Sequence, residues 1–398
     1  MADLEKFRSE THSWLEANAP KSLVGARGDA LEGVWGGKKA VYENPDRKLW
    51  LDVMAEKGWT SPTWPTEYGG GGLSSKEAKV LAGEMRRLKL PAPLVGFGLT
   101  MIGPTLLQYG NEEQKKEHLP RVCRGEIRWC QGYSEPDAGS DLAALQCKAV
   151  DDGDHFLITG TKVWTSYADE SDWIFSLVRS NPDVKKQAGI TFILIDMDSP
   201  GVTVRPIQLI SGASPFCETY FENVRVPKAN VLGGIDGGWT VAKALLGHER
   251  NMIAGTFGGA GGGGRRKTLA DHARRYLPEV DGKLADPVFR DEIAQIELDA
   301  RAFALTVQRA GDGAKAGHKP GPESSLFKVY GTELNMRRQE LMVRIAGPQA
   351  LGWEGDGFEE DELALTRTWL RSRGNALEGG TSEIQRNIIA KRVLGLPD

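Results

Sequence analysis

The length, composition and charge of this chain exclude several classes of protein. Its 398 residues allow two or three packed units, and 40% hydrophobic with 26% charged residues exclude disorder, collagen and a pure coiled coil as whole-chain structures. Its 50 lysines and arginines against 54 aspartates and glutamates give a net charge of −4 without a long block of either sign, so no basic surface for nucleic acid is expected.

The start of the chain, MADLEKFRSETHSWLEA, is acidic and lacks the apolar core of a signal peptide. No apolar run approaches the ~18 residues that a membrane-spanning helix needs. The six histidines lack metal-binding spacing. Four cysteines without CxxC spacing are expected to be reduced thiols, namely Cys123, Cys130, Cys147 and Cys217. We therefore expect a soluble cytoplasmic protein without a metal site.

Residues 1–127 are expected to form a helical N-terminal domain. Turn residues interrupt the helical pattern at NPDRK, at SPTWPTEYGGGGLSS (61–75) and at KLPAPL (89–94). Proline ends helices, and the glycines at 69–72 permit positive φ angles.

The pattern changes to short β-type runs in residues 128–234. Gly, Pro and Asp separate the runs, which are HFLITGTKVWTSY, WIFSLV, ITFILIDM, VTVRPI and TYFENVRV. These runs predict a compact central sheet or β-barrel domain.

Helical periodicity returns in residues 235–398. One apolar face steps by three and four through Ile293, Ile296, Ala300, Phe303, Val307 and Ala310. A second apolar face is expected along Leu326, Tyr330, Leu334, Leu341 and Ile345. Helices, then strands, then helices predict an α+β protein with a C-terminal helical bundle.

Two polar segments are candidates for contact with a ligand. WCQGYSEPDAGSDLAAL (129–145) offers hydroxyls and backbone amides, although an ordinary turn before a strand has the same composition. KVWTSYADESDW places Trp164 and the hydroxyls of Thr165 and Ser166 on a β-type run. A flat aromatic ring beside hydroxyls suits an isoalloxazine ring, although an isolated tryptophan is more often part of a core.

A glycine run at 258–264 contains a G-x-G-x-x-G match at Gly259, Gly261 and Gly264. The segments on both sides are expected to be helical, whereas a dinucleotide fingerprint follows a β-strand. The SxxK and GxSxG patterns of serine hydrolases do not occur. We interpret the run as a helix end that permits close backbone approach.

The chain resembles the acyl-CoA dehydrogenase family over almost its whole length. The blocks that carry the resemblance follow one another in family order, and they are WPTEYGG (64–70), YSEPDAGSD (133–141), GTKVWTS (160–166), FENVRVPKANVLG (221–233), GHER (247–250), GPQALGWEGDGF (347–358) and EGGTSEIQRNIIAKRVLGLP (378–397). The resemblance implies FAD, a helical N-terminal domain, a central β-barrel and a C-terminal four-helix bundle.

The resemblance also implies which residues contact FAD. From one subunit these are Gln131, Ser134, Ser140, Trp164 and Ser166, with Ser140 also near the acyl-CoA thioester; from the neighbouring subunit, Arg266 and the segment from Gln349 to Gly352; and from the C-terminal helix, Thr381 and Glu383. The segment at Asp286 and Pro287 departs from the family pattern, since a glutamine is expected there. That departure weakens the assignment of Arg266.

Two glutamates compete for the role of catalytic base. Glu378 lies one residue before the position where many family members carry their base, and Gly379 occupies that position. Glu249 matches the site used by the isovaleryl and long-chain branches, which also have glycine at the later position. We expect Glu249 to be the base, Arg250 to be structural or near CoA, and the Gly379 N–H to face the thioester oxygen. A carboxylate in an apolar pocket would have the raised pKa that α-proton removal needs.

The resemblance predicts FAD-dependent α,β-dehydrogenation of an acyl-CoA thioester to the trans-2-enoyl-CoA, with electrons passing to an electron-transfer flavoprotein. By analogy the acyl group is branched, alicyclic or steroid-derived, which suggests a role in β-oxidation. A homotetramer built as a dimer of dimers, or a heterotetramer, is expected. The alternatives are a non-catalytic or half-site FAD-binding subunit of a heteromeric enzyme, and an acyl-CoA oxidase.

Overall fold

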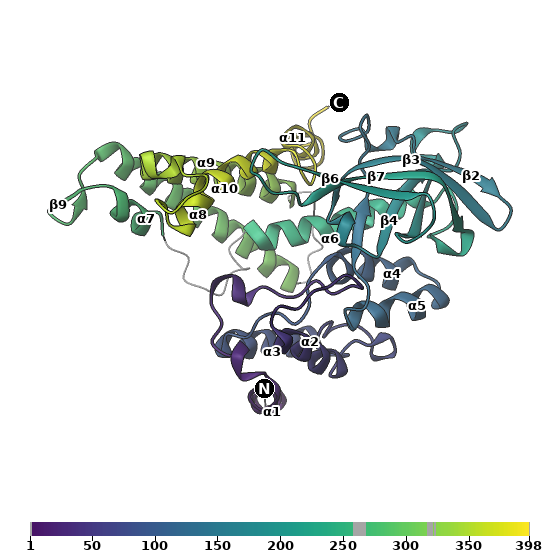
Figure 1. The fold of residues 1–398 in the computed structure, drawn as a ribbon, viewed down its shortest axis with the longest axis horizontal. Helices are drawn as coiled ribbons and strands as arrows, with labels where there is room; N and C mark the ends of the chain where they lie inside the picture. The colour runs from purple at the N-terminus through teal and green to yellow at the C-terminus, as the bar shows by residue number, and fades with distance from the viewer. Residues whose placement is uncertain (1, 258–267, 317–320, 322–323, 398) are drawn as a thin grey trace. The chain divides into compact units, whose positions relative to one another are not determined.

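The computed structural model describes residues 2–257, 268–316, 321 and 324–397, and the chain divides into two compact units (Figure 1). Unit 1 comprises Met1–Ile207 and Pro215–His248, and unit 2 comprises Gln208–Ser214 and Glu249–Asp398. The predicted order of a helical part, a sheet and a second helical part is confirmed.

The N-terminal part of unit 1 is helical. Its α-helices are α1 (Ala2–Asn18), α2 (Pro45–Glu56), α3 (Ser75–Leu88), α4 (Gly103–Tyr109) and α5 (Glu112–Cys123), with a π-helical turn at Gly98–Ile102 before α4. The Ser74 hydroxyl accepts a hydrogen bond from the Glu77 N–H, and the Glu77 carboxylate accepts one from the Ser74 N–H. This capping box explains why α3 starts directly after the glycine-rich turn.

The turn at 61–75 depends on its glycines, as the sequence predicted. Gly69 and Gly72 have φ angles of 87° and 62°, in the region that favours glycine. A Cβ on Gly70 would lie 2.3 Å from the Trp64 carbonyl oxygen. The backbone can therefore double back tightly between α2 and α3.

Eight strands of unit 1 form one sheet. They are β1 (Trp129–Gly132), β2 (Lys148–Asp152), β3 (His155–Ser166), β4 (Trp173–Arg179), β5 (Ile190–Asp196), β6 (Val202–Ile207), β7 (Phe216–Pro227) and β8 (Val231–Leu232). The strand order is β6-β7-β3-β2-β4-β5-β8, and β1 pairs in parallel with β4.

The predicted central sheet domain is confirmed, but the sheet is not closed into a β-barrel among the described residues. Its end strands β6 and β8 do not pair with each other. Closure requires the two end strands to pair along their length at a consistent stagger, and β8 has only two residues. In addition, β1 pairs with the first half of β4, whereas β2 meets β4 only at Lys148 and Arg179.

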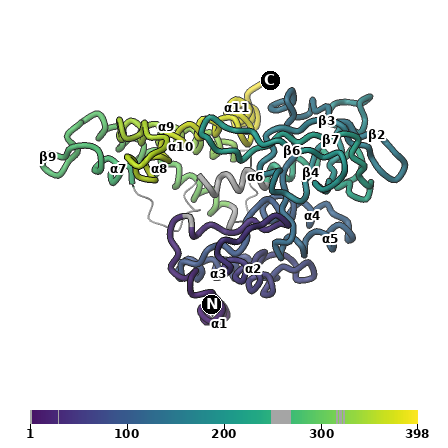
Figure 2. The backbone as a smooth tube through the Cα atoms, in the orientation of Figure 1, coloured from purple at the N-terminus to yellow at the C-terminus, as the bar shows by residue number. Residues whose placement is uncertain are grey.

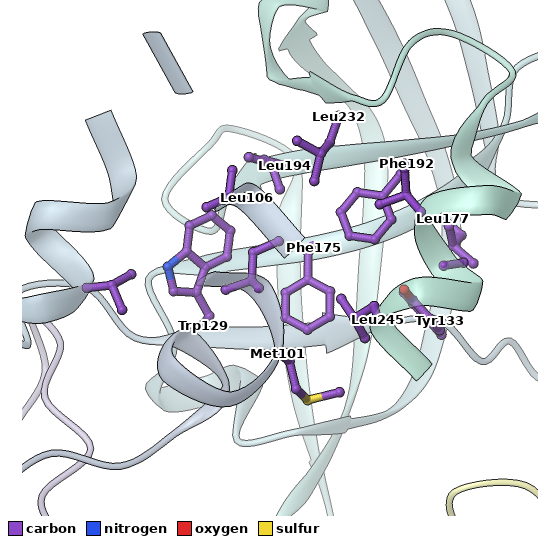
Figure 3. Close-up of a cluster of buried hydrophobic side chains, with 14 of the residues drawn as sticks. Met101, Leu106, Trp129, Tyr133, Phe175, Leu177, Phe192, Leu194, Leu232 and Leu245 are labelled. Carbon is purple, nitrogen blue, oxygen red and sulfur yellow. The ribbon is translucent and has the colours of Figure 1, made fainter. Parts of the chain in front are cut away.

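Both faces of β4 and β5 are buried, which explains their nearly unbroken apolar sequences. Phe175 and Phe192 lie parallel at 6.1 Å between ring centroids and belong to a cluster with Met101 and Leu245 from the helices of unit 1 (Figure 3). Ile174 and Ile193, on the opposite face of the sheet, belong to a second cluster formed mainly by side chains of the other strands. The alternation of side chains along β4 and β5 therefore supplies two cores.

Helix α6 (Gly238–Phe257) begins in unit 1, and the remaining helices belong to unit 2. They are α7 (Leu269–Tyr276), α8 (Pro287–Lys315), α9 (Ser324–Ala346), α10 (Glu360–Ser372) and α11 (Ser382–Ile388). A short hairpin of β9 (Glu279–Val280) and β10 (Lys283–Leu284) separates α7 from α8. No described helix has the length and hydropathy needed to cross a membrane.

Helix α9 is at the centre of unit 2. It packs against α7, α8, α10 and α11, and Figure 2 shows α8, α9 and α10 running side by side. The predicted apolar face of α8 is confirmed, since Ile293, Ile296 and Phe303 are buried. On α9 the prediction is wrong for Leu326, which is 41% exposed, while its neighbour Phe327 is buried.

Candidate active site

The two polar segments singled out in the sequence lie together in unit 1. The loop that follows β1 is joined to β3 by a hydrogen bond from the Val163 N–H to the Ser134 carbonyl oxygen, at 2.9 Å. Glu135 and Ala138 form a β-bridge that closes the loop on itself. Ser134 and Trp164, more than twenty residues apart in the chain, are therefore part of one surface.

A buried ion pair fixes this loop to the sheet. The Lys162 ammonium is fully buried and donates to the Glu135 carboxylate at 2.7 Å and to the Tyr133 carbonyl at 3.3 Å. The same carboxylate accepts hydrogen bonds from the backbone N–H groups of Gln146 and Cys147. Both carboxylate oxygens thus have partners, as a buried charge requires.

This ion pair was not predicted from the sequence, although β3 contains a signal for it. Phe156 and Ile158 are buried on one face of the sheet. Lys162, an even number of residues further along β3, continues the same alternation and is also buried. A lysine at a position that should be apolar indicates a buried acidic partner.

Trp164 is an exposed residue in a strained conformation. Its φ angle is 61°, which is rare for a bulky side chain, and the register of β3 against β7 shifts between Lys162 and Thr165. The indole is 55% exposed and meets the Phe216 ring edge-on at 6.1 Å. Strain of about 1–3 kcal/mol persists where the surrounding structure imposes it, and such residues cluster at functional sites.

The bulge at Trp164 separates the two hydroxyls that follow it. Thr165 is fully buried, and its hydroxyl has no hydrogen-bond partner among the described residues. Ser166 is half-buried. Of the two hydroxyls, that of Ser166 is therefore the one available to a ligand.

The other residues of unit 1 predicted to contact FAD differ in exposure. Gln131 is half-buried on β1, opposite Phe175 of β4. Ser134 is half-buried and Ser140 is exposed. The structure thus joins the backbone of Ser134 to β3 next to Trp164, while Gln131 and Ser140 lie before and within the same loop and Ser166 ends β3.

The predicted residues of unit 2 lie at two turns. Gln349 is exposed on the 3-10 segment Gly347–Leu351, and a Cβ on Gly352 would lie 2.5 Å from the Phe358 ring. Thr381 caps α11, since its hydroxyl accepts a hydrogen bond from the Ile384 N–H at 3.2 Å. The pKa of Glu383 is lowered, first by a hydrogen bond from the backbone N–H of Glu383 to its own carboxylate and then by a hydrogen bond from the Thr381 hydroxyl.

The Glu378 carboxylate is held on both sides. Arg371 donates to one oxygen at 2.7 Å, and the Asn375 amide donates to the other at 2.5 Å. The Asn335 amide of α9 in turn donates to the Asn375 amide oxygen at 2.9 Å. Gly379 and Gly380, which follow, have φ angles of 63° and 87° and form a tight turn into α11.

Three predicted residues lie wholly or partly outside the described part of the chain. Glu249 and Arg250 lie on the backbone of α6, but their side chains are outside the described part. Arg266 and the glycine run 258–264 lie outside the described residues altogether.

Thiol and metal chemistry find no support among the described residues. The four cysteines are free and buried. Burial raises the pKa of Cys130 to about 12 and the pKa values of Cys147 and Cys217 to about 11, so these thiols are protonated at neutral pH. No cluster of His, Cys, Asp and Glu that could hold a metal ion occurs in the described ranges.

Three family profiles match successive parts of the chain. They are the acyl-CoA dehydrogenase N-terminal domain at residues 38–126, the middle domain at residues 130–224 and the C-terminal domain at residues 236–394.

Individual relatives match from end to end. Acyl-CoA dehydrogenase IpdE1 of Mycobacterium tuberculosis is 34% identical over 400 residues, covering 100% of this chain and 99% of the relative. A solved structure described as the Tcur3481-Tcur3483 steroid ACAD is 31% identical, with a TM-score of 0.76 and coverage of 100% and 98%. The ChsE4-ChsE5 complex from Mycobacterium tuberculosis is 27% identical, with a TM-score of 0.72 and the same coverage.

Proposed function

The chain belongs to the acyl-CoA dehydrogenase family of oxidoreductases, and from that premise we propose that it converts an acyl-CoA thioester to the trans-2-enoyl-CoA with FAD as cofactor. The observation that carries the proposal is the strained, exposed Trp164 beside the Ser134 loop. A strained backbone that exposes a large aromatic ring to solvent does not improve packing of the core. A flat ligand could pack against the exposed ring, which gives the strain a function.

The residues present fit a flavin. Trp164 offers an aromatic face, Ser134, Ser140 and Ser166 offer hydroxyls, and Gln131 offers an amide. The family resemblance implies further FAD contacts from Thr381 and Glu383. It also implies contacts from a neighbouring subunit, through its Arg266, Gln349 and Gly352. FAD supplies the hydride acceptor when bound. The Lys162–Glu135 pair keeps the loop and β3 in register for that contact.

Glu249 is the proposed base that removes the α-proton of the acyl group. The contacts of Glu378 support this choice, since Arg371 and Asn375 occupy both of its carboxylate oxygens. With both oxygens hydrogen-bonded, Glu378 lacks a free oxygen directed at a substrate. Glu378 is thereby better suited to holding the turn that contains Gly379.

Gly379 is proposed to donate its backbone N–H to the thioester oxygen. The charge that develops on this oxygen when the α-proton leaves needs preorganised donors. The positive φ angle of Gly379 is natural for glycine, and glycine places no side chain between the N–H and the substrate. Arg250, next to Glu249, is proposed to lie near CoA.

We propose a bulky acyl group, either branched, alicyclic or derived from a steroid. The position of Glu249 supports this by analogy with the isovaleryl branch, and one similar structure is described as a steroid ACAD. Electrons are proposed to pass to an electron-transfer flavoprotein. Because another similar structure is a complex of two proteins, a heteromeric half-site role is the second candidate.

Anaerobic titration with a panel of acyl-CoA thioesters tests the proposal. The purified protein should carry one non-covalent FAD per subunit, form a dimer-based oligomer and lose its yellow colour with bulky acyl-CoA. Bleaching that requires a second polypeptide would support the half-site role, and rapid recoloration in air would support an oxidase. A colourless protein that takes up no FAD would contradict the proposal.

Trp164→Gly should weaken FAD binding without destabilising the fold. Glycine adopts a positive φ angle without strain, so the melting temperature of the flavin-free protein should stay the same or rise. Loss of the aromatic contact should weaken FAD affinity about tenfold, measured by fluorescence titration. Unchanged FAD affinity would assign Trp164 to the sheet surface alone. Val150→Gly, at another exposed apolar position of the sheet, serves as control.

A further inference from the structure

A polar stripe runs along α9 on a face other than the apolar face predicted through Leu334 and Leu341. Its members recur every three or four residues on one face of the helix, and they are Ser325, Lys328, Thr332, Asn335 and Gln339. Ser325, Lys328 and Thr332 are each no more than 2% exposed. The face of α9 that carries this polar stripe is therefore built for polar contacts.

One end of the polar stripe is hydrogen-bonded to the turn before α11. Asn335 accepts from the Gln339 amide at 3.4 Å and donates to Asn375, which donates to Glu378. This chain of side-chain amides connects α9 to the Glu378 carboxylate. The polar stripe thus faces the segment that contains Glu378, Gly379 and Thr381.

The other end of the polar stripe has unsatisfied polar atoms. Among the described residues, the Lys328 ammonium has no hydrogen-bond partner, and neither have the Ser325 hydroxyl, the Ser382 hydroxyl and the Gln385 side-chain oxygen. Ser382 and Gln385 are three residues apart on α11, which packs on α9, and both are buried. These groups point to a polar interior between the two helices.

The charges that act on Lys328 come from carboxylates around this interior. They are Glu378 and Glu383, on either side of the turn, and Glu333 of α9, which is paired with Arg386 of α11. Burial lowers the pKa of Lys328 from 10.5, and the carboxylates oppose that shift only in part. A buried ammonium without a direct partner destabilises a fold, so stability alone does not account for this lysine.

We propose that Lys328 is a positioning residue whose buried charge attracts Glu378 and Glu383 and so holds Gly379 and Thr381, which lie between them in the chain, in place. The inference rests on the proposed function, because that function places the thioester oxygen at Gly379 and FAD at Thr381 and Glu383. Lys328 itself is not proposed to touch substrate or FAD, and it acts on them only by positioning the turn from Glu378 to Glu383.

The first test is unfolding of the flavin-free protein with Lys328→Met, which keeps the length of the side chain and removes its charge. The folded-state pKa of Lys328 is lowered, so the charged form destabilises the folded protein below pH 10.5 and this cost disappears as the pH rises. The Met variant should therefore melt at the same or a higher temperature than the wild type. The difference should be largest at neutral pH and should shrink toward pH 10.5.

The second test is retention of FAD by the same variant. Lys328 contributes to the lowered pKa of Glu383, so its removal should raise that pKa, and FAD should be released on acidification at a higher pH than from the wild type. FAD affinity at neutral pH should fall about tenfold, because side chains in one network couple at this level. Lys283→Met, an exposed lysine of unit 2, is the matched control and should change neither property.

The outcomes separate this inference from the proposed function. A Met variant that fails to fold, or that melts at a lower temperature than the wild type, overturns the inference, because the charge would then stabilise the fold. Lys328→Gln also removes the charge and should show the same change in melting temperature as Lys328→Met. Wild-type FAD affinity and an unchanged pH profile in both variants also overturn it, while the proposed function stands. A wild type that binds no FAD overturns the proposed function, and the unfolding comparison still decides whether the ammonium is costly.

Discussion

Glu249→Gln is expected to slow reduction of bound FAD by acyl-CoA by ~100-fold or more, about 3 kcal/mol in the activation barrier. Glutamine keeps the shape of the side chain but cannot accept the α-proton. Glu378→Gln should have a much milder effect, because its carboxylate is already bound to Arg371 and Asn375. Anaerobic stopped-flow absorbance with a good substrate measures the rate.

The control for this comparison is substrate affinity, measured separately so that weak binding is not mistaken for slow chemistry. The double variant shows whether one carboxylate partly replaces the other. Fast bleaching in Glu249→Gln together with its loss in Glu378→Gln would reverse the assignment. In that case, the contacts of Glu378 with Arg371 and Asn375 would have to open when substrate binds.

Lys162→Met should reduce the free energy of unfolding by about 3–5 kcal/mol, since it leaves the buried Glu135 carboxylate without its counter-charge. The two backbone N–H groups of Gln146 and Cys147 remain, but they do not neutralise the charge. Because Glu135 connects the loop to β3, FAD should also be lost at a lower urea concentration. Urea unfolding followed by tryptophan and flavin fluorescence measures both effects.

Lys48→Met provides the matched control. Lys48 pairs with Asp52 at 2.5 Å, a distance similar to that in the buried pair, but both side chains are 47% exposed. An exposed pair of this kind contributes at most about 1 kcal/mol. Equal effects of the two substitutions would contradict the importance given to burial of the Lys162–Glu135 pair.

The sequence predicted local structure well where one periodicity dominates. The run HFLITGTKVWTSY became β3, WIFSLV and ITFILIDM became β4 and β5, and the apolar face through Ile293 and Phe303 became the buried face of α8. These elements are decided by the alternation of side chains within a few residues. Strands β1 and β8 are too short for that signal and β2 is mainly polar, so none of the three was predicted as a strand.

The candidate site was predicted in its parts and not in its arrangement. Sequence alone identified the 131–141 loop and Trp164, but the hydrogen bond from Val163 to Ser134 and the Lys162–Glu135 pair depend on strands that meet only in the fold. Likewise, the positive φ angle of Trp164 results from the register shift between β3 and β7. A choice between Glu249 and Glu378 from sequence rested on resemblance, whereas the contacts of Glu378 come from Arg371 of α10 and from Asn375, which α9 holds through Asn335.

The sequence by itself therefore determined the family and the order of helices and strands, and it supplied a prediction of the residues that contact a flavin. Only the tertiary structure decided that the sheet stays open, that Leu326 is exposed and that α9 carries a buried polar stripe. The physical reason is the same in each case. Periodicity fixes which side chains share a face, but the partner that covers the face comes from distant residues, and that partner decides whether apolar packing or a buried charge is stable.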